Sequence, residues 1–112
     1  MATVNISAAN YAANGAAGTG SADVITITTP IVSNKSLVYG MTIGVFKDEA
    51  ESILVSMNSS LSGTPGNAAG GEPAYDGKDV FIPVEALLHK NVVQPVYVIS
   101  TSGTVNYWVT LS

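Results

Sequence analysis

Short segments in which apolar and polar residues alternate recur along this chain, and they constrain its fold more than any other feature. Six are rich in Val, Ile and Thr and are bounded by Gly, Pro, Asn or Ser, which is the pattern of β-strands. These six are residues 24–29, 37–46, 52–58, 80–84, 95–100 and 104–111. Residues 3–6 form a seventh candidate. About seven short strands predict an all-β fold.

A chain of 112 residues has the size of one domain. Seven strands separated by turns favour an antiparallel β-sandwich of the immunoglobulin-like type, which we assign to residues 23–112. The chain contains no cysteine, so the disulfide that joins the sheets of antibody domains is absent. Aromatic side chains are expected to fill the core together with Val and Ile. Those aromatic residues are Tyr39, Phe46, Phe81, Tyr97 and Tyr107.

Residues 1–22 are predicted to be a flexible N-terminal arm. Segment 7–22 consists almost entirely of Ala, Gly, Asn, Ser and Thr, which bury too little apolar area to offset the entropy of ordering them. Tyr11 is its one aromatic residue and could anchor it on a partner. Residues 59–79 are similarly poor in core-forming side chains and are predicted to be a long variable loop.

Local signals place several turns and edges. Gly103 within residues 101–103 predicts a hairpin between the last two strands. Pro83 predicts a sheet edge or a strand end, and the charged residues 47–51 predict an exposed connection. Residues 85–90 have a helical composition sufficient for a turn or two. Gly40 and Gly44 share one side of their strand, which indicates a bulge or a close approach by another group.

Composition excludes several functions. Charged residues make up 11% of the chain, the formal net charge is −4, and the basic residues are four lysines, so no basic patch can bind nucleic acid. Without cysteine, neither a thiolate zinc site nor a cysteine nucleophile is possible. No apolar run approaches the roughly 18 residues of a spanning helix, so we expect no membrane insertion.

The candidates for catalysis or metal binding are few. His89 could be a general base, but the chain lacks a Gly-x-Ser-x-Gly nucleophile elbow, and a turn histidine is the preferred interpretation. Glu72, Asp76 and Asp79 could hold Ca²⁺, but Lys78 and the irregular spacing favour a solvated turn. The glycine-rich residues 15–20 lack the lysine and helix of a phosphate site. We therefore predict no enzyme activity, no catalytic residue, no metal and no cofactor.

Trp108 is the most informative side chain. Val105, Tyr107, Val109 and Leu111 alternate along the last strand, so Trp108 lies on the other side with Asn106 and Thr110. If the apolar side faces the core, Trp108 stands on a polar surface suited to sugar stacking or a subunit contact. The alternative is that Trp108 packs under the arm or a neighbouring strand. We select Tyr11, Asn106, Trp108 and Thr110 as candidate interaction residues.

Three segments resemble repeated immunoglobulin-like modules of bacterial surface proteins and adhesins. They are Val-Tyr-Gly-Met at 38–41, the Pro-containing segment 82–91 that ends in Asn91, and the Tyr-x-Val strand with its glycine turn at 96–103. The resemblance spans residues 23–112. It departs from the family at residues 42–45, where Thr-Ile-Gly-Val replaces the usual Gly-Asp and strand Trp. The resemblance implies a binding or spacer module without catalytic residues.

Two functional classes follow. The first is a non-enzymatic structural or interaction module of a bacterial surface or a phage virion, which associates with copies of itself or docks on a larger structural protein. The second is a small carbohydrate-binding β-sandwich that uses Trp108 and the loop 59–79 to bind a glycan. An extracellular surface or virion location is expected for both, because this charge-poor, Ser/Thr/Gly/Asn-rich composition is common there.

Overall fold

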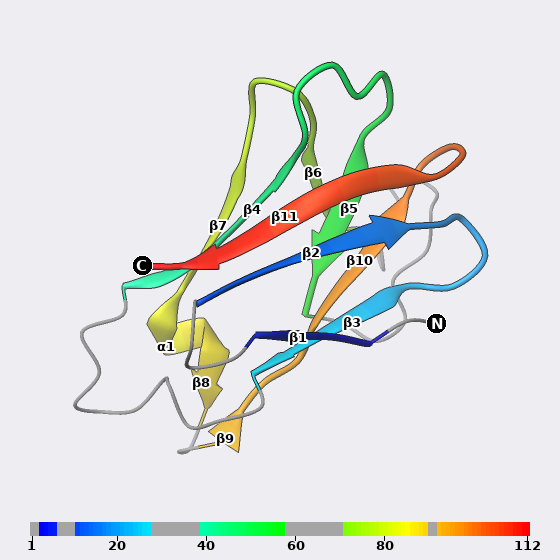
Figure 1. Ribbon diagram of the computed structural model, residues 1–112. Helices are drawn as coiled ribbons and strands as arrows, with labels where there is room; N and C mark the ends of the chain where they lie inside the picture. Colours follow the sequence, from blue (N-terminus) through cyan, green and yellow to red (C-terminus); the bar gives the residue numbers. More distant parts are fainter. Residues whose placement is uncertain (1–2, 7–10, 28–38, 58–70, 90–91) are drawn as a thin grey trace.

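The computed structural model is a sandwich of two twisted β-sheets (Figure 1). The structure describes residues 3–6, 11–27, 39–57, 71–89 and 92–112. Several expected features lie outside these ranges, among them residues 28–29 and 37–38 of two predicted strands and most of the loop 59–79.

The first sheet has five strands, here called the five-stranded sheet. Their spatial order is β1 (Thr3–Ile6), β3 (Asp23–Ile27), β10 (Val96–Ser100), β5 (Ile53–Ser56) and β6 (Glu72–Ala74). The four-stranded sheet has the order β2 (Ala12–Ala17), β11 (Val105–Leu111), β4 (Gly40–Val45) and β7 (Val80–Pro83). Neighbouring strands are antiparallel except β1 and β3, which are parallel. The predicted all-β sandwich is confirmed, and β7 lies at a sheet edge as Pro83 indicated.

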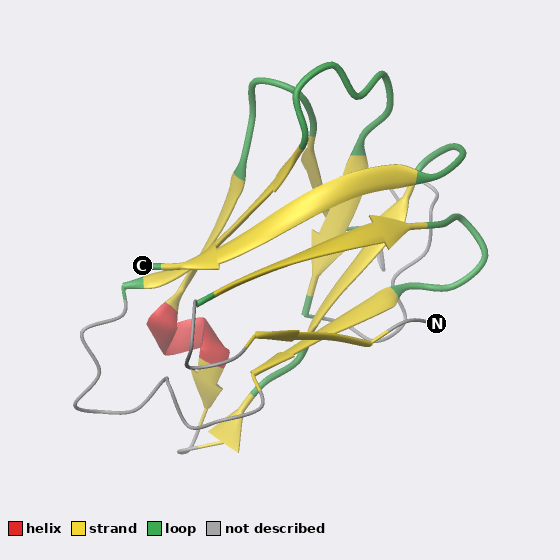
Figure 2. Cartoon of the chain, in the orientation of Figure 1, coloured by secondary structure: helices red, strands yellow, loops and turns green. Residues whose placement is uncertain are grey.

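A short helix follows β7 (Figure 2). It is α1 (Val84–Leu87), and it leads into a two-stranded sheet of β8 (Leu88–His89) and β9 (Val92–Val93). The predicted helical turn at 85–90 is thus a single turn that ends at Leu87, and the next two residues belong to β8. Among the described residues, no helix is both long and apolar enough to cross a membrane.

Consecutive strands mostly alternate between the two sheets. The predicted hairpin at residues 101–103 is therefore wrong: β10 belongs to the five-stranded sheet and β11 to the four-stranded sheet, so the turn joins the sheets. Gly103 does adopt the expected positive φ of 63°. A hairpin and a turn between sheets have the same sequence pattern, since both connect two strands with one buried face.

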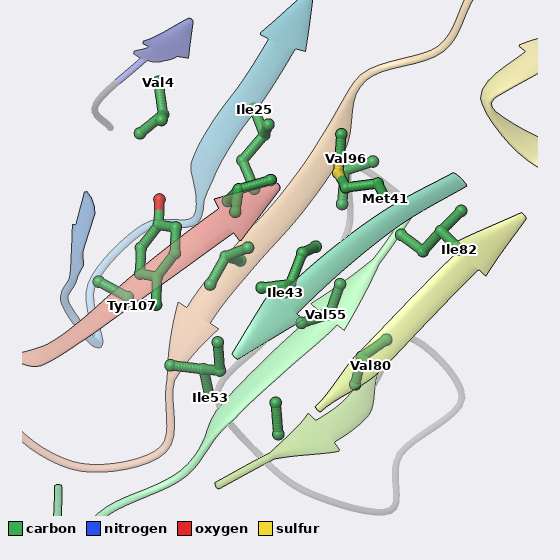
Figure 3. Close-up of a cluster of buried hydrophobic side chains, with 14 of the residues drawn as sticks. Val4, Ile25, Met41, Ile43, Ile53, Val55, Val80, Ile82, Val96 and Tyr107 are labelled. Carbon is green, nitrogen blue, oxygen red and sulfur yellow. The ribbon is translucent and has the colours of Figure 1, made fainter. Parts of the chain in front are cut away.

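The inner faces of the two sheets form the main core (Figure 3). In β11 the residues Val105, Tyr107, Val109 and Leu111 are all buried, which confirms the predicted alternation. Met41, Ile43 and Val45 of β4 lie beside them in the same sheet, and residues of β3, β5 and β10 cover them from the other. The core is thus mainly aliphatic, with Tyr107 as its large aromatic member.

Most of the aromatic residues expected in the core lie elsewhere. Tyr39 is 78% exposed, Phe81 51% and Phe46 41%, whereas Tyr107 is fully buried. Tyr97 is half-buried and packs with Leu54 and Ile99 in a separate small cluster. The expectation was wrong for Phe81 because its neighbours Val80 and Ile82 take the inward positions of β7, which leaves Phe81 on the outer side.

The expected N-terminal arm contains two strands of the sandwich. β1 and β2 are edge strands of the five-stranded and four-stranded sheets, and Val4, Ile6 and Ala17 are buried in the main core. The small residues of β2 have a structural reason: a Cβ at Gly15 would collide with the ring of Tyr107. In this segment, which is poor in apolar residues, Gly15 therefore leaves room for the Tyr107 ring.

Candidate interaction face

The outer side of the four-stranded sheet carries most of the predicted interaction residues. Asn106, Trp108 and Thr110 lie there because the intervening residues of β11 point into the core. Asn14, Thr42 and Phe81 are their outward-facing neighbours on β2, β4 and β7. We call the surface formed by these six residues and Asp79 the aromatic face.

Trp108 packs over a glycine. It is paired with Gly44 of β4, and a Cβ added to Gly44 would collide with the indole ring at Cζ2. The indole Nε1–H donates a hydrogen bond of 3.2 Å to the carbonyl oxygen of Val45. The ring is thus held against the sheet and half-buried. It packs across its neighbouring strand β4, yet on the outer side of the sheet.

Phe81 of β7 also packs over a glycine of β4. It is paired with Thr42, and its ring extends over Gly40, where an added Cβ would lie 2.5 Å from Cζ. The close approach that Gly40 and Gly44 indicated in the sequence is therefore confirmed at both positions. The two glycines are four residues apart, which is about 13–14 Å along a strand. The rings of Phe81 and Trp108 therefore lie over Gly40 and Gly44, on the outer side of β4.

Polar groups surround and separate these rings. Oδ1 of Asp79 lies 2.5 Å from the position that a Cβ on Gly44 would occupy, which places the carboxylate beside Trp108. Asn14 flanks Trp108 from β2, and Thr42 and Thr110 form a cross-strand pair between the two aromatic residues. Neither lysine in the described ranges belongs to this face. Lys47 follows β4 in the exposed connection, and Nζ of Lys78 lies 3.3 Å from the carbonyl of Pro73.

Tyr11 lies apart from the other three predicted residues. It precedes β2, is 43% exposed with a φ of 53°, and its carbonyl accepts a hydrogen bond of 2.8 Å from the backbone N–H of Leu111. Leu111 points inward, so this register puts Tyr11 at the end of the sheet rather than beside Trp108. The structure therefore brings together three of the four candidates.

The candidates for chemistry are dispersed. His89 is the last residue of β8, paired with Val92. Oδ2 of Asp76 accepts a hydrogen bond of 3.2 Å from the backbone N–H of Asp48, and Glu72 lies on β6 opposite Val55. Within the described ranges, no three His, Cys, Asp or Glu residues are grouped so as to hold a metal ion.

A hollow of about 300 Å³ lies away from the aromatic face. Its described lining is Thr26, Ile27, Val93, Gln94 and Pro95. None of these described side chains is titratable.

One polar pair lies inside the sandwich. The hydroxyl of Tyr107 donates a hydrogen bond of 2.9 Å to Oδ2 of Asp23, and both residues are buried. Burial raises the pKa of the Tyr107 phenol well above its usual range, and the charge of Asp23 and the hydrogen bond raise it further. This pair joins the two sheets and is remote from solvent.

Sequence reasoning missed Phe81 and Asp79 as members of the aromatic face. The outward position of Phe81 could have been predicted from the alternation of side chains along its strand, because Val80 and Ile82 on either side of it face inward. The same alternation placed Trp108 on the outer side of β11. The position of Asp79 depends on how β7 pairs with β4, which the sequence does not reveal. The chain matches no family model, and no curated protein or solved structure shows significant similarity to it.

Proposed function

We propose that this protein is a non-enzymatic interaction module that binds its partner through the aromatic face. The observation that carries the proposal is the seating of Trp108 and Phe81 on Gly44 and Gly40, which keeps aromatic surface at the solvent side of a regular sheet. A sandwich with an aliphatic core does not need these rings for its packing. Exposed aromatic residues that are held in place are typical of binding surfaces.

A non-covalent role fits the groups on this face. Its side chains are aromatic rings, amides, hydroxyls and one carboxylate, and the residues that define it include no His, Cys or Lys. Catalysis by a nucleophile would require a base within hydrogen-bond reach of it. The face offers surface area and hydrogen-bonding groups instead.

We place this module on a bacterial surface or in a virion, where it would join copies of itself or a larger structural protein. The charge-poor composition supports this setting, and so does the resemblance of residues 38–41, 82–91 and 96–103 to immunoglobulin-like surface modules. We also propose the immunoglobulin-like type for the sandwich.

Hydroxyl-radical footprinting tests the binding role without knowledge of the partner. The oxidation rates of Trp108 and Phe81 would be compared between the purified chain and the chain in its native assembly. Tyr75 is the control, because it is 47% exposed and lies in the turn between β6 and β7. The proposal predicts slower oxidation of Trp108 and Phe81 in the assembly and unchanged oxidation of Tyr75. Equal rates for Trp108 and Phe81 in both samples would overturn it.

A further inference from the structure

We infer that the aromatic face binds a neutral glycan chain that lies along β4 from Phe81 to Trp108. The inference rests on the proposed function and specifies its ligand class. Four properties of the face support it: the way the two rings are held, their spacing, the charge between them and the hydrogen-bonding groups around them.

Both rings are held against the sheet, each over a glycine of β4. An aromatic anchor of a protein–protein interface projects into a pocket of the partner. Trp108 is held back from such a pocket, because its ring packs over Gly44 and its N–H donates a hydrogen bond to the Val45 carbonyl within the same sheet. The part of the indole that stays exposed is aromatic surface, and the face of an aromatic ring carries partial negative charge. The C–H groups on one side of a pyranose are a complementary surface for such a face.

The spacing of the rings favours an extended ligand. Gly40 and Gly44 are about 13–14 Å apart along β4, and each carries one ring. A short oligosaccharide that follows β4 can therefore contact both rings. Thr42 lies between Gly40 and Gly44 on the outer side of β4, and Thr110 is its cross-strand partner. Both side chains are small.

The polar groups match hydroxyls rather than ionic groups. Asp79 places a carboxylate acceptor beside the Trp108 ring, and Asn14 supplies an amide with both donor and acceptor atoms on the other side. A carboxylate and an amide can bind hydroxyls of a sugar stacked on the ring. A phosphate, sulfate or uronate would instead meet the Asp79 carboxylate, and the seven residues that define the face include no lysine to offset it. These groups therefore disfavour an anionic ligand, and a neutral glycan is the ligand that we infer.

The intrinsic fluorescence of the intact protein provides the test, since Trp108 is the one tryptophan of the chain. Laminarin, galactomannan and xyloglucan are the neutral probes, and polygalacturonate is the charged comparison. We expect a saturable change in Trp108 emission with at least one neutral polysaccharide, unaffected by salt, and none with polygalacturonate. No change with any neutral probe, or a stronger change with polygalacturonate, would overturn the inference.

Variants locate the binding site. Phe81→Ala is expected to weaken binding about 5- to 10-fold, the value of one aromatic contact, and Asp79→Ala to weaken it as well. The matched control Tyr75→Ala removes an equally exposed ring in the β6–β7 turn and should bind like the wild type. Equal losses in Phe81→Ala and Tyr75→Ala would contradict the site. Footprinting in the native assembly could protect Trp108 although no neutral polysaccharide binds. That result would support the proposed binding face but overturn the inference that it binds a glycan, and the ligand would then be a protein.

Discussion

The hydroxyl of Tyr107 on β11 donates a hydrogen bond of 2.9 Å to the carboxylate of Asp23 on β3, and this bond joins the two sheets through the core. The ring of Tyr107 passes Gly15 of β2 on its way. Residues of β2, β3 and β11 therefore meet at the Tyr107 side chain. In a chain without cysteine, this pair connects the two layers by a specific contact, although it is not covalent.

We expect Tyr107→Phe to lower the free energy of unfolding by about 1–3 kcal/mol, because it leaves the buried carboxylate of Asp23 without this donor. Asp23→Ala should also destabilise, since the phenol then loses its acceptor. The double variant should lose less than the sum of the two single losses. Urea denaturation of all four proteins measures this coupling, and strictly additive losses would show that the bond contributes nothing.

Stability should fall as the pH rises above about 10. An unfolded tyrosine ionises near pH 10, whereas burial raises the pKa of Tyr107 in the folded protein. The folded state then keeps a proton that the unfolded state releases, so unfolding becomes easier by up to about 1.4 kcal/mol per pH unit. Tyr107→Phe lacks this contribution and should show a shallower decline. Urea midpoints between pH 8 and 11 compare the two proteins, and parallel declines would refute the prediction.

Gly15→Ala should destabilise the protein, because the new methyl group would collide with the Tyr107 ring, which cannot retreat without breaking the bond to Asp23. We expect a cost of about 1–3 kcal/mol, as for overpacking in a core. Gly18→Ala is the matched control, since nothing lies within 4 Å of its Cβ position. Thermal unfolding should separate the two variants clearly. A Gly15→Ala protein as stable as Gly18→Ala would show that β2 does not lie against Tyr107.

Trp108→Ala should cost about 1–2 kcal/mol of stability, less than the roughly 3–5 kcal/mol typical of a core aromatic residue. The loss comes from the hydrogen bond to Val45 and from exposing Gly44. The fold should remain intact by circular dichroism. A protein that is unfolded at room temperature would instead assign Trp108 to the core.

The alternation of residues on β11 allowed its two faces to be predicted correctly, and the prolines and glycines allowed β7 and the close approaches on β4 to be anticipated. These features follow from local geometry, in which side chains alternate along a strand. The same reasoning places Asn106, Trp108 and Thr110 on one surface.

Strand pairing could not be predicted in this way. Gly103 forms the expected turn but joins two sheets, because a buried face looks the same whichever sheet it belongs to. β2 was missed because its Ala and Gly residues suggest disorder until the Tyr107 ring is in place beside Gly15. Asp79 reaches Trp108 only through the pairing of β7 with β4.

Acrylamide quenching of Trp108 fluorescence tests most directly whether the aromatic face is the binding surface. The measurement compares the free protein with the protein in saturating laminarin, galactomannan or xyloglucan, with binding established separately by affinity gel electrophoresis. The account predicts moderate quenching in the free protein, as for a half-buried ring, and markedly weaker quenching when a polysaccharide is bound. Unchanged quenching of a protein that is retarded by its polysaccharide in the gel would place the ligand elsewhere and contradict this conclusion.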